Sequence, residues 1–182
     1  MTMQLITTEL GGELHLFHLE GLLPADQVLV VHTTDLILSL VSTHSQNDNP
    51  ILLQRVLTQT DMRILLSLLR YPSCCPYDIV RASLFCSYNG LLAGLFSKGS
   101  EWQATVDESR LLLQRAKANG TWRKELMPLY KALSHLRSNL HPFGLTVSGS
   151  LSYLGYALIS LPLSQQQKGD AGHDYRPLYV GS

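Results

Sequence analysis

Cysteine and charge are both scarce in this sequence of 182 residues. The three cysteines are an odd number, and Cys74 and Cys75 are adjacent, which fits neither a disulfide framework nor the spaced pairs of a zinc site. We therefore expect a reducing, cytoplasmic location. A basic segment at the start is also missing, because the first Lys or Arg is Arg55, so no secretory signal is predicted.

Long apolar runs are absent as well. Residues 142–167 contain no Lys, Arg, Asp or Glu, but this segment is broken by prolines and glycines, so we expect no membrane-spanning helix. Hydrophobic residues nevertheless make up 45% of the chain. A chain of this size buries roughly 70% of its unfolded surface, enough for a core without metal or disulfide staples.

Charge of one sign is missing from the start of the chain. Residues 1–50 contain six acids and no Lys or Arg, whereas residues 51–160 contain twelve bases and six acids. The net charge of the whole chain is zero, which by itself argues against a nucleic-acid partner. The asymmetry between the two parts instead favours a nucleic-acid or acidic-surface partner for the basic part, although a solvated basic face gives the same count.

Signatures of catalysis and cofactor binding are also missing. The sequence has no GxxxxGK[ST] phosphate loop, no GxGxxG fingerprint and no GxSxG nucleophile elbow. His15 and His18 lie in one expected strand, where their side chains point to opposite faces. No acid or cysteine lies at ligand spacing from them, so no metal site is predicted. We expect a protein that is not an enzyme and that needs no cofactor.

The acidic first part predicts an antiparallel sheet. Apolar or alternating runs at 4–10, 13–19, 27–32 and 35–41 are separated by turn residues, and the polar cluster 42–50 then reads as a loop. The last of these strands is expected to stop near Val41. Residues 1–50 therefore form an acidic N-terminal β part.

Helices are predicted from residue 58 onward. Thr58 or Thr60 can cap a helix with a single apolar stripe, and Pro76 opens a second helix that Asn89-Gly90 is expected to end. A further helix is expected over 106–118. We interpret the stretch at about 90–120 as an insertion. The apolar stripe of the first helix consists of Met62, Leu65, Leu66 and Leu69.

The most regular segment is 124–140, where leucines recur at intervals of three and four residues and predict one buried stripe. Pro142 and Gly144 end this helix, and runs at 145–147 and 155–159 predict a β-hairpin. The polar residues 161–182 are expected to be a loose C-terminal tail. The leucines of the stripe are Leu126, Leu129, Leu133, Leu136 and Leu140.

In residues 51–160 this order of elements resembles the OmpR/PhoB-type winged helix-turn-helix DNA-binding domain. Leu57 to Leu66 resembles the family's Leu-Thr-x-x-Glu-x-x-Leu-Leu pattern, with Asp61 in place of Glu. The family's recognition helix ends in Leu-Arg-x-x-Leu, matched by Leu136 to Leu140, and its wing ends in Gly-Tyr-x-Leu, matched by Gly155 to Leu158. The family also has a small antiparallel sheet before the first helix.

The resemblance implies an α+β fold: a winged helix-turn-helix with an N-terminal antiparallel sheet and a helical insertion before the recognition helix. Three departures from the family stand out. The stretch before the recognition helix is longer than the family's loop, residues 148–154 contain no basic wing residue, and fifty N-terminal residues are too few for a receiver domain. At Tyr156 the family packs a side chain, so we expect this tyrosine in the core.

The resemblance also implies that the 124–140 helix enters the major groove of double-stranded DNA in a cytoplasmic transcription regulator of a bacterium. Its polar face would contact bases and phosphates, with Arg123 and Lys124 at its start on the backbone. An ordinary amphipathic helix with a solvated face explains the same pattern. The candidate DNA-binding residues are Arg123, Lys124, Tyr130, Lys131, Ser134, His135, Arg137, Ser138 and Tyr153.

An alternative from another class is a degenerate winged-helix module that binds a protein and not DNA. The missing wing base and the zero net charge favour it. Such a partner would bind through residues 1–50 or 90–120. A homodimer is also expected on the DNA-binding interpretation, because one helix in one groove reads few bases.

Overall fold

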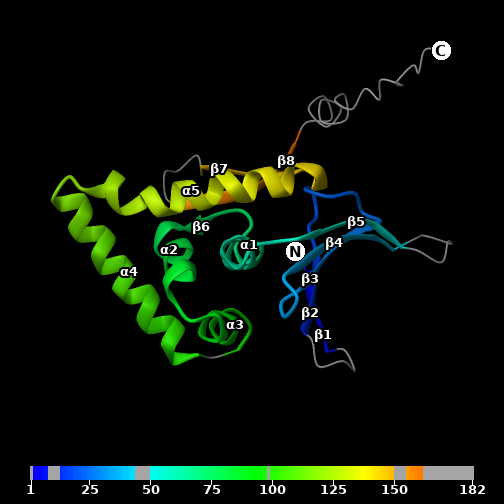
Figure 1. Ribbon diagram of the computed structural model, residues 1–182, viewed down its shortest axis with the longest axis horizontal. Coiled ribbons are helices and arrows are strands. Elements are labelled where there is room, and N and C mark those ends of the chain that lie inside the picture. Colours follow the sequence, from blue (N-terminus) through cyan, green and yellow to red (C-terminus); the bar gives the residue numbers. More distant parts are fainter. Residues whose placement is uncertain (1, 8–12, 44–49, 98, 150–154, 162–182) are drawn as a thin grey trace, which may run out of the picture.

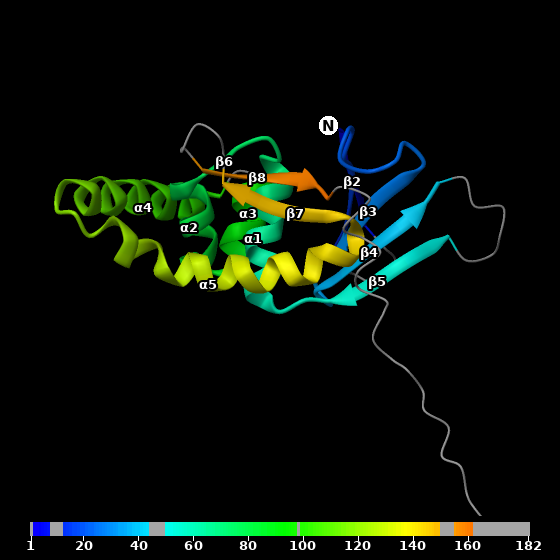
Figure 2. The same ribbon diagram turned by 90° about the horizontal axis from the view of Figure 1, so that it is seen from above.

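The computed structural model describes residues 2–7, 13–43, 50–97, 99–149 and 155–161. In these residues the fold is α+β, as expected, with two antiparallel sheets and five α-helices. Figures 1 and 2 show the larger sheet at one end of the molecule and the helix α4 (Ser100–Ala118) at the other. None of the described helices is long and apolar enough to cross a membrane.

The larger sheet has five strands in the order in which they occur along the chain, each antiparallel to the next. It has one strand more than expected. We expected the N-terminal β part to end at residue 50, but residues 51–56 pair with the preceding strand and form an edge of the sheet. The strands are β1 (Thr2–Thr7), β2 (Glu13–His18), β3 (Gln27–His32), β4 (Ile37–Ser42) and β5 (Ile51–Val56).

The inner face of this sheet consists of apolar side chains that meet across neighbouring strands. Phe17 lies opposite Leu29, and Val31 lies opposite Leu38, and all four are fully buried. Such cross-strand pairs fix the register, because a shift by one residue would turn the whole set toward water. The antiparallel N-terminal sheet predicted from alternation is therefore confirmed.

The helices follow the sheet: α1 (Gln59–Arg70), α2 (Tyr77–Phe85), α3 (Tyr88–Phe96), α4 (Ser100–Ala118) and α5 (Trp122–Leu140). Thr58 caps α1 by accepting a hydrogen bond at Oγ1 from the backbone N–H of Asp61, at 3.1 Å. Asn89-Gly90, expected to end the second helix, instead lies in the first turn of α3. Ser87 explains the difference, since its hydroxyl oxygen caps that helix by accepting from the Gly90 N–H at 3.0 Å.

A second, three-stranded sheet joins a short strand between the first two helices to the C-terminal hairpin. Its order is β6 (Cys75–Pro76), β8 (Gly155–Ser160) and β7 (Leu145–Gly149), all antiparallel. The predicted hairpin is confirmed by the register of its two strands. Gly155 is required here, because a Cβ atom at this position would lie 2.0 Å from the carbonyl oxygen of Cys75.

The helical core is built on α1 and α5, which lie against each other. The four side chains of the predicted α1 stripe and all five leucines of the α5 stripe have exposed fractions of 1% or less. Figure 1 shows α5 running along the α1–α2 side of the molecule, with α4 leading to its first residue, and Figure 2 shows β7 beside α5. Tyr156 is also in the core, as expected, with an exposed fraction of 4%.

Candidate nucleic-acid interface

The outward face of α5 carries most of the residues proposed from sequence for DNA binding. Because the leucine stripe faces the core, the side chains between the leucines face solvent. Arg137 is half-buried, and Tyr153 lies outside the described residues. The exposed members of the set are Arg123, Lys124, Tyr130, Lys131, Ser134, His135 and Ser138.

Positive charge dominates this face. In α5 four bases accompany a single acid, Glu125. Within the described part of the chain, Arg123, Lys124 and Lys131 form no ion pair with a carboxylate. Their charges are therefore free to meet an anionic partner, and phosphate is the anion that a cationic helix face commonly meets in nucleic acid.

Two further cations, Arg115 and Lys117, extend this surface along the end of α4. Residues 115–124 contain four bases and no acid, and all four bases are exposed. Gly120, with φ of +69°, provides the left-handed residue that turns the chain from α4 into α5. The cluster of four bases is visible in the sequence. Because we interpreted residues 90–120 as an insertion, Arg115 and Lys117 were not grouped with the helix that follows them.

Arg137 is used differently from the other bases of α5. Its Nε–H donates a hydrogen bond of 2.7 Å to the carbonyl oxygen of Val147 in β7. This bond attaches the hairpin to α5 and holds the guanidinium beside the strand. The structure thus gives Arg137 a positioning role in addition to the phosphate contact expected from its charge.

His135 is held by a carboxylate from a different helix. Its Nδ1 lies 2.7 Å from Oδ2 of Asp61 in α1, and because a carboxylate only accepts, Nδ1 is the donor. Asp61 is 1% exposed, whereas the His135 side chain is 59% exposed. The hydrogen bond therefore holds the Nδ1 side of the His135 ring against α1 and leaves the rest of the ring in solvent.

The same carboxylate oxygen collects two more donors. The hydroxyl of Thr58 donates to Oδ2 of Asp61 at 2.7 Å, and Nδ2 of Asn139 donates to it at 3.2 Å. The other oxygen, Oδ1, is buried and has no partner among the described residues. The spacing of residues along the chain gave no sign of this contact between Asp61 and α5.

Aromatic rings connect the start of α5 to the hairpin. Tyr77 in α2 makes edge contacts with Trp122 at 5.5 Å and with Tyr156 at 5.1 Å between ring centroids. Burial raises the pKa of Tyr156 and that of Tyr77, so both phenols stay neutral at physiological pH. These rings act as packing groups that set the position of the N-terminal end of α5.

Other candidate chemistry is sparse. In the residues that the structure describes, no group of three or more His, Cys, Asp and Glu side chains could hold a metal ion. Burial raises the pKa of the Cys75 thiol and that of the Cys86 thiol, which opposes formation of the reactive thiolate. Neither cysteine is thereby suited to nucleophilic chemistry.

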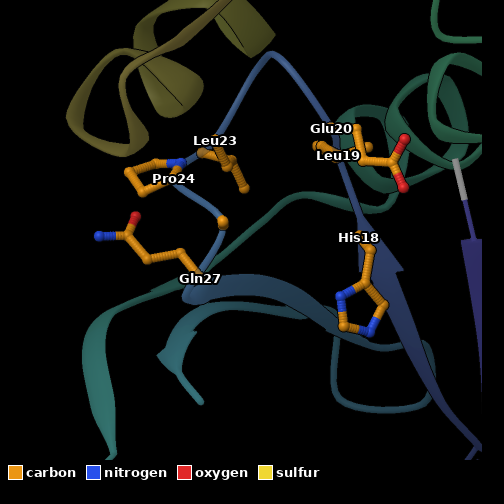
Figure 3. A pocket seen from close by; sticks show the side chains of 7 residues that line it. His18, Leu19, Glu20, Leu23, Pro24 and Gln27 are labelled. Carbon is orange, nitrogen blue, oxygen red and sulfur yellow. The ribbon is translucent and has the colours of Figure 1, made fainter. Parts of the chain in front are cut away.

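A hollow of about 380 Å³ lies where β2 leads into β3 (Figure 3). His18, Glu20 and Gln27 are its polar lining residues. Figure 3 shows the Glu20 carboxylate and the Gln27 amide pointing to opposite sides, so they do not converge on one point. A ligand site needs convergent polar groups, and we assign none here.

Comparison with known proteins gives no assignment. No family model, no curated protein and no solved structure matches this chain. The function must therefore be inferred from the fold and the side chains of this protein alone.

Proposed function

We propose that this protein is a cytoplasmic, DNA-binding transcription regulator whose α5 helix enters the major groove of double-stranded DNA. The observation that carries the proposal is the exposed basic face of α5, which lies opposite a fully buried leucine stripe and is followed directly by a β-hairpin. A helix that is anchored on one side and cationic on the other is suited to the groove. The proposal assigns the protein no catalytic step.

The arrangement of elements supports a winged helix. A winged helix-turn-helix has two helices, a recognition helix and a hairpin, and here α1, α2, α5 and the β7–β8 hairpin occur in that order. The short strand β6 joins the hairpin in one sheet. In this proposal α3 and α4 are the insertion before the recognition helix, and the five-stranded sheet precedes the domain.

The face of α5 divides into two kinds of contact. Arg123 and Lys124, with the neighbouring bases of α4, would bind backbone phosphates and position the protein without reading sequence. Lys131 and Ser134, further along the exposed face, would meet base edges. Met127, which is 49% exposed on the same face, adds an apolar group of the kind that contacts a thymine methyl.

A protein-binding function is favoured by one specific feature, the edge strand β5. Leu52 and Val56 are 52% and 73% exposed, on a strand that pairs with β4 alone among the described strands. Open edges with apolar side chains are surfaces on which another strand can be added. A regulator that dimerises would use such an edge together with α5, and a protein-interaction module would use it instead of α5.

The test is fluorescence anisotropy of a labelled random-sequence duplex at about 50 and 200 mM salt. We compare the wild type with Lys124→Gln, and with Arg55→Gln as a control that removes the same charge from β5. Arg137 is left intact, because its substitution would also release the hairpin. Both altered residues are exposed, so neither substitution is expected to change the fold.

DNA binding predicts an affinity that falls steeply with salt. Because Lys124 is assigned to a backbone phosphate, Lys124→Gln reduces the slope of log K against log salt by about 1, and Arg55→Gln leaves it unchanged. No binding at low salt by the folded protein, or equal effects of both substitutions, would refute the proposal.

A further inference from the structure

A second hollow, of about 530 Å³, lies between α2, α4 and the first residue of α5. This volume is within the range of small-ligand sites. Seven side chains line it: Tyr77, Asp78, Arg110, Leu113, Gln114, Lys117 and Trp122. They come from three helices that meet only through the tertiary fold.

The apolar part of the hollow is suited to a flat ring. Trp122 and Tyr77 are both half-buried and stand nearly perpendicular to each other, with an interplanar angle of 85°. Leu113, which is 5% exposed, completes the apolar wall. Aromatic faces set at an angle accept another ring in edge or offset contact, so they favour a planar aromatic body.

The charged part of the hollow leaves one positive charge unbalanced. The Nε–H of Arg110 donates to Oδ2 of Asp78 at 2.9 Å, and its Nη1 lies 3.1 Å from Oδ1 of Asp107. This arginine is therefore already paired with two carboxylates. Lys117 has no carboxylate partner within the described ranges, and its ammonium is available to a ligand.

From these two halves we infer that the hollow is a binding site for a small aromatic carboxylate. The ring packs against Trp122, Tyr77 and Leu113, and the carboxylate pairs with Lys117. A single negative charge is specified, because Lys117 is the one lining cation that has no carboxylate partner in the described residues. The site lies against the start of α5, but the inference does not depend on DNA binding by that helix.

The experiment follows the two tryptophan indole N–H signals of the full-length protein by NMR as a probe is added. Benzoate and 1-naphthoate are the anionic probes, and 1-naphthalenemethanol is the neutral control of similar shape. Trp102 is an internal reference, since it is 6% exposed and lies outside this hollow. The two signals are assigned with Trp122→Phe.

We expect saturable movement of the Trp122 signal with at least one carboxylate, and little movement of the Trp102 signal. Lys117→Gln should weaken carboxylate binding about fivefold, as expected for one exposed ion pair, and leave the neutral alcohol unaffected. Arg115→Gln removes the same charge from the same turn of α4, outside the hollow, and should have no effect.

The inference is overturned if neither carboxylate moves the Trp122 signal at millimolar concentration. It is equally overturned if the alcohol binds as well as the carboxylate, or if Lys117→Gln and Arg115→Gln weaken binding alike. Because the probe is titrated without DNA, these results are independent of whether the protein binds DNA.

Discussion

The contact between Asp61 and His135 joins α1 to the proposed recognition helix, and its contribution to stability can be predicted. The perturbation is Asp61→Asn, which keeps the size of the side chain but removes the charge that three donors share at Oδ2. The second perturbation is His135→Ala, which removes one of those donors. The two substitutions and their combination form a double-mutant cycle.

The magnitude follows from burial. An asparagine oxygen can still accept at the Oδ2 position, but its NH₂ group would then occupy the place of Oδ1, which is buried without a partner in the described residues. A buried, unpaired donor costs about 1–3 kcal/mol. His135 is largely exposed and water can replace its bond, so His135→Ala should cost about 1 kcal/mol.

Coupling between the two residues is the decisive quantity. A direct, charge-assisted hydrogen bond predicts a coupling free energy of about 1 kcal/mol, which urea unfolding followed by circular dichroism can measure. Ser134→Ala, at an exposed neighbouring position of α5, is the control and should change the free energy of unfolding by less than about 0.5 kcal/mol. Because the asparagine oxygen can still accept from His135, additive effects of Asp61→Asn and His135→Ala would refute the charge assistance of this hydrogen bond.

Three further predictions concern other parts of the fold. Gly155→Ala should lower the free energy of unfolding by several kcal/mol, as a severe change in the core does, because the new Cβ would collide with the Cys75 carbonyl. Urea unfolding measures this loss. Hydrogen bonds from the side chain and the backbone N–H of Ser87 lower the pKa of the Glu101 carboxyl. The stabilisation from these bonds is present at neutral pH and is lost as pH falls through that lowered pKa. The difference in unfolding midpoint between wild type and Glu101→Gln should therefore vanish in acid. Burial raises the pKa of Tyr88 to about 12, so the neutral phenol stabilises the fold below its usual pKa and this contribution is lost as pH rises toward 12. Tyr88→Phe should show a shallower alkaline decline in thermal midpoint.

Sequence periodicity predicted those elements whose stability comes from one strongly amphipathic face. The stripes of α1 and α5 are recognisable in the sequence because their apolar residues recur at helical spacing. In the structure all of these residues are buried. The strands β2 to β4 and the hairpin were also predicted, since turn residues separate their apolar runs.

The fifth strand escaped prediction for a physical reason. In β5 five of the six side chains are exposed and one is half-buried, so no alternation marks the strand and its pairing with β4 decides the structure. The start of α3 was missed because Asn89-Gly90 is typical of a turn, whereas the cap at Ser87 outweighs that preference.

The candidate site was only partly predictable. The cationic face of α5 follows from helical spacing, but Asp61 and His135 are 74 residues apart and meet only through tertiary packing. The bond between Arg137 and the Val147 carbonyl likewise depends on where the hairpin returns to the helix. No local pattern encodes contacts of this kind.

The most direct test of the central claim is to map the DNA contact by NMR on the full-length, ¹⁵N-labelled protein. On addition of a random-sequence duplex at low salt, the account predicts shifts concentrated in residues 115–138, at the end of α4 and along the exposed face of α5. Residues of β5 should be unaffected by DNA in the monomer. Shifts confined to the five-stranded sheet, or none anywhere in α5, would contradict the assignment of α5 as the DNA-reading helix.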